Sequence, residues 1–290
     1  MGLLKYCLKK YLRDNKINRF SVSSAGIEAL PQSADPKIVE ELGKLGVNMS
    51  KHEQRRLTQR IVDENDIIVS MGDQHYDFIL KNFGVKSFYF NDLAVGKSVG
   101  IKDIWEVIPD HETNREAVES YISKVVSYIW SKTPKIAEEL LVRNFLFEDF
   151  VNKRTDHRNG FPFIPVFESK HSIAFLSINI PKHQNGHVLV IPKKRYRDLD
   201  SIPKRVLNDL ISSVSFIGRV IKKSHGGYNV LLNNGTDAGQ YIFHTHFHLI
   251  PRSPNDSIQM GLWDSQDLTA EKFVEYSNSF KKRVEESKHS

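Results

Sequence analysis

Three histidines alternate with other residues in the stretch HTHFHLIPR, which runs from His244 to Arg252. Successive side chains of a β-strand point to opposite faces, so residues two apart share a face. A strand over this stretch would therefore place His244, His246 and His248 side by side. Because neutral imidazoles act as nucleophiles and as metal ligands, this spacing indicates a chemical site.

A glycine-punctuated stretch, LLNNGTDAGQ, comes immediately before the histidines. Glycine lets the backbone approach a phosphate closely, and consecutive N–H groups form a nest that binds anions. Farther upstream, NGHVLVIPKK supplies a fourth histidine, His187, at the start of another predicted strand. The combination favours a phosphate site over three histidines that only hydrogen-bond one another. A zinc site is the other alternative, but no nearby carboxylate or cysteine completes a ligand set.

These three motifs, GHVLVIPKK, NNGTDAGQ and HTHFHLIPR, resemble in order and spacing those of the histidine triad (HIT) family of nucleotide hydrolases and transferases. The resemblance covers residues 145–252. It implies that His246 is the nucleophile, which attacks an α-phosphate and forms a covalent nucleotidyl-histidine. It also implies that His244, His248 and His187 orient His246 and bind phosphate oxygens.

Further site residues follow from the same resemblance. Backbone groups near Gly239 and the side chain of Gln240 would hold the transferring phosphate and help the leaving group. Asn233 matches a phosphate-side asparagine. Asn179 matches the position that binds the ribose hydroxyls, and Ser177 would take it in a shifted alignment. No metal or other cofactor is implied, apart from magnesium that a nucleotide substrate can carry.

Three residues depart from the family pattern. Tyr241 stands where many members have Ser or Thr, Thr245 replaces an apolar residue, and Arg195 stands where a histidine is common. His248 favours the hydrolase branches, because the galactose-1-phosphate uridylyltransferase branch usually has Gln there. A DNA-repair branch would suit a basic surface, but no zinc-binding module follows His248, so nucleic acid is not the favoured partner.

The first half of the chain alternates predicted helices and strands. A helix that Asp35 caps and Gly46 ends, and a second one that Gly84 ends, flank predicted strands over 66–71 and 85–90. A longer amphipathic helix over 114–130 follows, and SKTPK then predicts a boundary. Such alternation predicts a parallel sheet covered by helices.

The second half mixes strands and helices differently and is expected to be α+β. The predicted strands are HSIAFLSINI, GHVLVIP, YNVLLNN and QYIFHTHFHLI, and the predicted helices are PKRVLNDLISSVSFIGRVIKK and LTAEKFVEYSNSFKKRVEES.

The segment FSVSSAGIEALPQSADPKIVEELGKLGVNMSKHEQRRL, followed by DIIVSMGDQH, resembles the low-molecular-weight protein tyrosine phosphatases, which include one class of arsenate reductases. The resemblance covers residues 1–130, and Asp110 stands at the family's general acid, although His111 replaces the usual Pro. The family's catalytic loop, C-x5-R-S, precedes a helix that MGLLKYCLKKYL resembles, and the loop itself is missing. Cys7 lies inside that helix and does not replace the nucleophile. Asp110 therefore belongs to a degenerate phosphatase site.

Two explanations of the missing loop stay open. Either the chain starts at an internal Met of a longer bifunctional enzyme, or the domain has lost its first strand and persists as a binding or dimerisation module. Loss of that strand would open an edge of the parallel sheet. Together the resemblances imply an N-terminal α/β domain with a parallel sheet, residues 1–134, and a C-terminal α+β domain with an antiparallel sheet, residues 135–290. The HIT resemblance implies a homodimer.

Composition sets the remaining limits. The 290 residues carry a net charge of +6, which favours an anionic ligand. No apolar run approaches the roughly 20 residues that cross a bilayer, no secretory signal is found, and a single cysteine suits the reducing cytoplasm. Together with these limits, the HIT resemblance implies a cytoplasmic nucleotide hydrolase or nucleotidyltransferase that cleaves a phosphoanhydride or phosphoramidate bond, such as that of a dinucleoside polyphosphate, in an adenosine-containing substrate. A nucleotide-binding regulator without turnover is the alternative.

Overall fold

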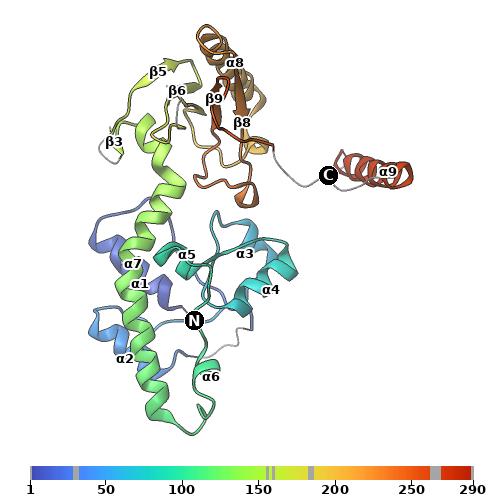
Figure 1. The fold of residues 1–290 in the computed structure, drawn as a ribbon. Coiled ribbons are helices and arrows are strands. Elements are labelled where there is room, and N and C mark those ends of the chain that lie inside the picture. Colours follow the sequence, from blue (N-terminus) through green and yellow to red (C-terminus); the bar gives the residue numbers. More distant parts are fainter. Residues whose placement is uncertain are drawn as a thin grey trace.

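The computed structural model describes residues 2–28, 33–154, 157–158, 161–181, 186–261 and 269–288. Two parts of different architecture share one long helix, α7 (Arg115–Val151), which passes from the first part into the second (Figure 1). A two-stranded parallel sheet lies in the first part and a five-stranded antiparallel sheet in the second, as predicted. In the portion of the chain that the structure covers, no helix is long and apolar enough to cross a membrane.

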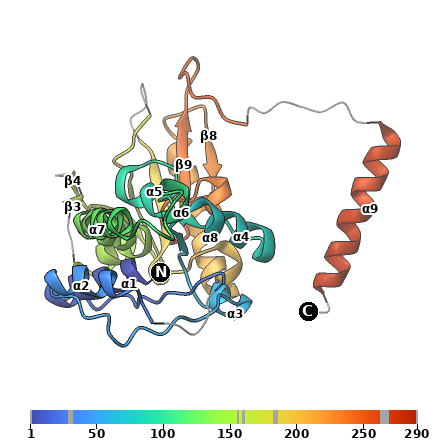
Figure 2. The ribbon, with the colours of Figure 1, turned by 90° about the horizontal axis from the view of Figure 1, so that it is seen from below.

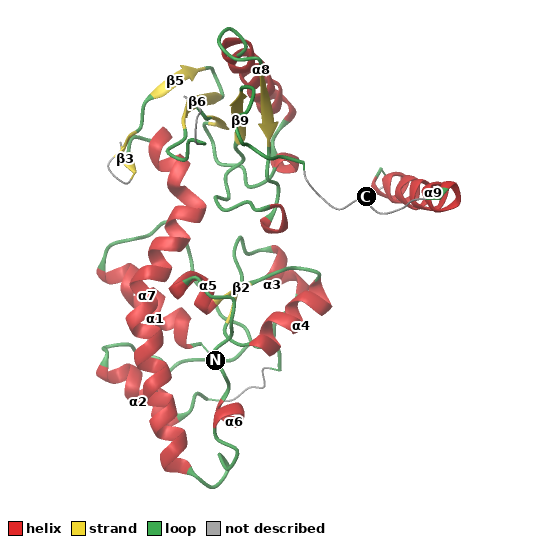
Figure 3. Ribbon diagram, in the orientation of Figure 1, coloured by secondary structure: helices red, strands yellow, loops and turns green. Residues whose placement is uncertain are grey.

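The first part is mainly helical, and its strands are short (Figure 3). Its elements are α1 (Leu3–Asp14), α2 (Pro36–Lys44), α3 (Gln59–Asp63), β1 (Val69–Ser70), α4 (Asp73–Phe83), β2 (Phe88–Tyr89), α5 (Phe90–Val95) and α6 (Ile104–Val107). Helices α1, α2 and α5 pack against α7, and α4 packs against β1. Strands β1 and β2 pair in parallel, with Val69 opposite Phe88.

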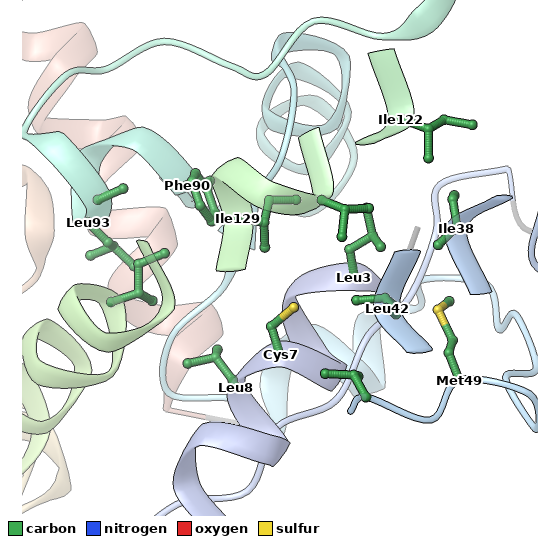
Figure 4. Close-up of a cluster of buried hydrophobic side chains, with 14 of the residues drawn as sticks. Leu3, Cys7, Leu8, Ile38, Leu42, Met49, Phe90, Leu93, Ile122 and Ile129 are labelled. Carbon is green, nitrogen blue, oxygen red and sulfur yellow. The ribbon is translucent and has the colours of Figure 1, made fainter. Parts of the chain in front are cut away.

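Local signals explain where these helices begin and end. The Asp35 side chain accepts the N–H of Lys37 at 2.7 Å and caps α2. Gly46 and Gly84 follow α2 and α4 with φ of +68° and +67°, in the left-handed region that favours glycine. The amphipathic α1 buries Cys7 among apolar side chains of α1, α2 and α7 (Figure 4). The predicted caps are thus confirmed.

The second part is built on the antiparallel sheet, whose strand order is β5-β6-β7-β9-β8. Its elements are β3 (His157–Arg158), β4 (Phe161–Pro162), β5 (Pro165–Glu168), β6 (Ser172–Leu176), β7 (Val188–Pro192), η1 (Leu199–Ser201), α8 (Lys204–Ile221), β8 (Gly227–Leu231), η2 (Thr236–Ala238), β9 (Phe247–Arg252) and α9 (Ala270–Ser287). Helix α9 buries no residue and stands apart from the rest in both views (Figures 1 and 2).

Helices cover both faces of this sheet. Ala174 and Val190 pack toward α8, whereas Phe175 and Leu189, their neighbours along the strands, pack with Phe147 of α7. Because side chains alternate between the two faces, a strand covered on both sides consists of apolar residues without a break. This explains the apolar runs IAFL of β6 and VLVIP of β7.

The predicted end of the long helix at Trp130 is wrong. Helix α7 continues through Pro134 to Val151. Proline costs about 3 kcal/mol inside a helix, but the following Ile136 and Ala137 are fully buried, so packing holds the helix together. The predicted division after residue 134 is therefore not marked by a break in the helix. The packing of α7 changes from the first core to the second between Leu140 and Leu146.

The predicted strand over 240–250 is also partly wrong, because β9 begins only at Phe247. The backbone before it bonds outside the sheet. The N–H of Phe243 donates to the carbonyl oxygen of Arg143 on α7, and the N–H of Thr245 donates to that of Tyr196. Of the three alternating histidines, only His248 lies in the strand. Strand β5 was not predicted, nor were β3 and β4.

Two glycines of the first part have different backbone conformations, and replacing each by alanine tests these conformations. Gly84 has a positive φ and Gly43 lies inside α2, and an added Cβ would meet no atom within 4 Å at either position. We expect Gly84→Ala to lower the free energy of unfolding by about 1 kcal/mol, because of its backbone conformation alone. Gly43→Ala should raise it by up to about 1 kcal/mol. Urea denaturation measures both, and equal effects would contradict the assigned conformations.

Candidate functional site

The histidines gather where β7, β9 and α7 meet. His248 lies on β9 opposite Leu189 of β7, so it shares the sheet face that α7 covers. His187 directly precedes β7, and its ring centroid lies 5.1 Å from that of His248. The rings of His246 and His248 are 4.9 Å apart. The structure therefore brings the predicted His187, His246 and His248 together.

Phe147 of α7 lies against the other side of this group. Its ring packs edge-on against His244 and His246, with centroid separations of 5.8 Å and 5.2 Å. The sequence interpretation missed Phe147, because it ended the helix at Trp130. The only signal in this region is the apolar spacing of the run LLVRNFLFEDF.

Hydrogen bonds fix the tautomers of His187 and His248. Nδ1 of His187 lies 2.6 Å from the carbonyl oxygen of Asn179, and a carbonyl only accepts, so the proton of His187 is on Nδ1. Its Nε2 is then an acceptor, and Nδ1 of His248 donates to it at 2.9 Å. Nε2 of His248 is left with a lone pair. It is buried and has no hydrogen-bond partner among the described residues.

The same argument fixes His246. Its Nδ1 lies 2.7 Å from the carbonyl oxygen of His244 and must donate to it. The lone pair of the neutral ring is therefore on Nε2. Burial lowers the pKa of His246, an effect opposed by the bond to His244. A buried, neutral imidazole with a lone pair on Nε2 can attack phosphorus.

His244 has a different position from the one expected. Its side chain is fully buried, and its Nε2 donates to the carbonyl oxygen of Pro192 at 2.8 Å. Burial lowers the pKa of His244 to about 4. The ring is not accessible to a phosphate in this structure. His244 therefore acts on His246 through its backbone carbonyl.

The glycine-rich loop is closed on itself. Gln240 is buried, its Oε1 accepts the N–H of Gly235 at 2.8 Å, and its Nε2 donates to the carbonyl oxygens of Arg197 and Ile242 at 2.7 and 3.3 Å. The N–H groups of Gly239 and Gln240 donate to carbonyls inside the loop. The groups expected to hold a phosphate thus hold the loop, and a phosphate would have to displace these bonds.

Each of the two predicted asparagines precedes a site histidine in the chain, Asn179 before His187 and Asn233 before His244. Asn233 approaches the carbonyl oxygen of Gly239 through Nδ2, at 3.4 Å. The side chain of Asn179 is exposed, while its backbone carbonyl holds His187. Ser177, the alternative ribose position, accepts the N–H of Asn179 at 3.1 Å. Of these residues, Asn179 is therefore the one that bonds a site histidine, His187, and it does so through its backbone carbonyl.

The three residues that depart from the family pattern either fix the backbone that carries the histidines or join the two parts. The hydroxyl of Tyr241 donates to Glu139 of α7. Thr245 bonds the carbonyl oxygen of Tyr196 through both its N–H and its hydroxyl, at 2.7 and 3.0 Å. Arg195 forms an ion pair with Asp66 of the first part, at 3.1 Å.

Arg143 stacks between the two parts. Its guanidinium lies 4.7 Å from the ring centroid of Phe88, in the first part, and 4.0 Å from that of Tyr241, in the second. Its backbone carbonyl also accepts the N–H of Phe243, next to His244. The phosphatase-like part therefore contacts the segment that carries the histidines.

Cys7 and Asp110, the two residues of the first part that were considered for a phosphatase site, both have structural roles. Cys7 is fully buried, and burial raises the pKa of its thiol to about 11. Asp110 is exposed, and its carboxylate accepts Nδ2 of Asn114 at 2.9 Å in the turn before α7. Over the described ranges of the chain, no three His, Cys, Asp or Glu side chains are placed to hold a metal ion.

The buried histidines predict a pH dependence of stability. Burial lowers the pKa of His244 to about 4 and of His248 to about 3, from 6.5. Below pH 6.5 the unfolded chain therefore binds protons that the folded chain does not. The stability from these groups is complete above pH 6.5 and is lost as the pH falls toward 4 and 3.

We expect urea denaturation to give a lower free energy of unfolding for the second part at mildly acidic than at neutral pH. His248→Asn should reduce this difference, and His225→Asn, in the turn after α8, serves as the control. An unchanged pH dependence in His248→Asn would contradict the buried neutral ring.

Comparisons with known proteins identify both parts. Residues 162–255 match the family model of the HIT domain, and residues 6–97 match that of the low molecular weight phosphotyrosine protein phosphatase. An uncharacterized HIT-like protein from Methanocaldococcus jannaschii is 46% identical over 92 residues, which are 31% of this chain and 70% of that protein.

Several relatives have names that describe an activity, and two of them are compared in detail. Adenylylsulfatase HINT3 from Arabidopsis thaliana is 39% identical over 38% of this chain and 54% of its own length, so this chain spans about half of that protein. Adenosine 5′-monophosphoramidase HNT1 from Saccharomyces cerevisiae is 35% identical over 40% of this chain and 70% of its own length. The alternating histidines, the matched HIT model and the identity to the Methanocaldococcus jannaschii relative lead to one conclusion: the chain belongs to the histidine triad family, and its residues 6–97 match the low molecular weight phosphotyrosine protein phosphatase model.

Proposed function

We propose that this chain is a nucleotide hydrolase that transfers a nucleotidyl group, by preference adenylyl, first to Nε2 of His246 and then to water. The observation that carries the proposal is the neutral His246 ring, with Nδ1 bonded to the His244 carbonyl and the lone pair on Nε2. The names adenylylsulfatase and adenosine 5′-monophosphoramidase of two relatives support an adenylyl group in the substrate.

In the first step, the lone pair of His246 Nε2 forms a bond to the α-phosphorus. The bond from phosphorus to the leaving group breaks, and the leaving group departs with its electron pair. The ring becomes a cation that keeps its proton on Nδ1, and the His244 carbonyl at 2.7 Å stabilises that charge. A sulfate or phosphate leaving group departs as an anion, whereas the amine of a phosphoramidate takes a proton from solvent as it departs.

In the second step, water attacks phosphorus on the opposite side from the imidazole. The bond between phosphorus and Nε2 breaks, its electron pair returns to His246, and the water proton passes to solvent. Nε2 of His248 has a lone pair without a protein partner among the described residues, but the atom is buried. We propose that it accepts a hydrogen bond from the water and orients it once the site opens to substrate. The His187 ring keeps His248 in this tautomer.

A second candidate function is nucleotide binding without turnover, as in a regulator. The closed glycine-rich loop favours it, because Gln240 and the N–H groups of Gly239 and Gln240 are used inside the protein. Calorimetric titration with AMP, beside a turnover assay by phosphorus NMR, separates the two functions. Tight binding with no product from any adenylyl substrate would establish the regulator.

Replacement of the nucleophile is the first functional test. With adenosine 5′-phosphoramidate, adenosine 5′-phosphosulfate and diadenosine tetraphosphate as substrates, we expect His246→Ala to lower turnover by about 1000-fold or more, as for other covalent nucleophiles. His225→Ala, a histidine outside the group, should keep full activity. Mass spectrometry of the quenched wild-type reaction should find the nucleotide on His246. Near-normal activity of His246→Ala would refute the assignment.

The phosphatase-like part should not hydrolyse aryl phosphates. Its general-acid candidate, Asp110, only assists a leaving group, and the buried Cys7 with a pKa of about 11 is a neutral thiol. We expect the full chain with His246→Ala to leave p-nitrophenyl phosphate intact, and Asp110→Asn to leave nucleotide turnover unchanged. Aryl phosphate hydrolysis that survives His246→Ala and is lost in Cys7→Ser would contradict this.

A further inference from the structure

Residues 195–197, here called the linking segment, lie between β7 and η1 and bond the phosphatase-like part at one residue, Asp66. Nη2 of Arg195 forms an ion pair with the Asp66 carboxylate at 3.1 Å, and Nη1 of Arg197 donates to the Asp66 backbone carbonyl at 2.7 Å. The carboxylate is 55% exposed, so water screens the ion pair and weakens it. The bond from Arg197 to the carbonyl is therefore the firmer attachment.

The same segment holds the histidine site from its other side. The carbonyl oxygen of Tyr196 accepts the N–H and the hydroxyl of Thr245, which stands between the two histidines whose bond fixes the His246 tautomer. The carbonyl oxygen of Arg197 accepts Nε2 of Gln240 at 2.7 Å. A shift of the linking segment would therefore move both the strand entry and the glycine-rich loop.

The side chain of Arg197 also contacts the residue before His244. Its guanidinium lies 5.0 Å from the ring centroid of Phe243, which is fully buried. The ring of Phe88, in the first part, lies 6.2 Å from the same ring, and the carbonyl oxygen of Arg143 accepts the Phe243 N–H. Arg197 thus helps to fix the backbone that presents the His244 carbonyl.

We propose that Arg197 is a positioning residue for His246, held in place by the backbone carbonyl of Asp66 in the phosphatase-like part. The inference rests on the proposed function, because it concerns the placement of the proposed nucleophile. A nucleophile displaced by about 1 Å can lose about 100-fold in rate. Because Arg197 acts through Phe243 and the linking segment, its loss should lower kcat and leave KM unchanged.

Three substitutions separate the donor of Arg197 from its bulk. Arg197→Met keeps an unbranched side chain beside Phe243 and removes the donor, whereas Arg197→Lys keeps a donor. Arg219→Ala is the matched control, since Arg219 also bonds a serine hydroxyl and lies beside a phenylalanine ring, but on α8, at the other face of the sheet. The measurements are the melting temperature, kcat and KM with adenosine 5′-phosphoramidate, and ¹⁵N NMR of the His246 ring.

We expect Arg197→Met to keep its fold and to lower kcat by about tenfold, the loss that fits one hydrogen bond from a charged donor. KM should stay within about twofold, because no substrate contact is removed. The fraction of His246 rings protonated on Nδ1 should fall, since the His244 carbonyl is no longer held in line. Arg197→Lys should keep kcat within about threefold of the wild type, and Arg219→Ala should match the wild type in every measurement.

Full kcat in folded Arg197→Met, or an equal loss in Arg197→Met and Arg197→Lys, would overturn the role of the donor. A lower kcat with an unchanged His246 spectrum would overturn positioning. If Arg197→Met does not fold, Arg197→Gln takes its place, because its amide is too short to reach the Asp66 carbonyl and the same losses are expected. A wild type that turns over no adenylyl substrate would refute the proposed function alone, since the spectra of the variants still test where Arg197 holds His246.

Discussion

The hydrogen bond from Nδ1 of His246 to the carbonyl oxygen of His244 decides which ring nitrogen holds the lone pair. A neutral imidazole has one donor and one acceptor, so occupying Nδ1 as a donor leaves Nε2 for chemistry. The bond exists because the backbone leaves the sheet before Phe247, where Phe243 and Thr245 bond α7 and Tyr196 instead of a strand. A regular strand through the three histidines would direct the carbonyl of His244 sideways to a neighbouring strand.

Helix α7 connects this geometry with the phosphatase-like part. Its first half belongs to the core around Ile122 and Ile129, and its second half covers the sheet face that carries His248. Phe147 packs on the ring of His246, and Arg143 stacks on Phe88 while holding Phe243. The first part therefore helps to position the segment that carries the histidines, through its contacts with Arg143 and α7.

Much of the fold could be predicted from local signals. The helix caps at Asp35 and Gly84 and the apolar runs of β6 and β7 depend on neighbours in sequence, and the structure has them where they were expected. The continuation of α7 through Pro134 could not be predicted in this way, because burial of Ile136 and Ala137 in a tertiary core outweighs the local preference of proline.

The sequence predicted which residues form the candidate site better than it predicted what each of them does. His187, His246 and His248 do come together, but the spacing could not show that the His244 ring is buried and bonded to Pro192. It also could not show that Gln240 holds its own loop, since this depends on the carbonyls of Arg197 and Ile242. Phe147 comes from a helix far away in sequence, so no local pattern links it to the histidines.

Nitrogen NMR of the histidine rings tests the central claim most directly. In ¹⁵N-labelled protein near neutral pH, with His246→Gln to assign the signals, the structure predicts a neutral His246 ring with a protonated Nδ1 and an unprotonated Nε2. The same spectrum should show the reverse tautomer for His244, whose Nε2 donates to Pro192. A His246 ring that is protonated on Nε2, or on both nitrogens, at neutral pH would contradict the account.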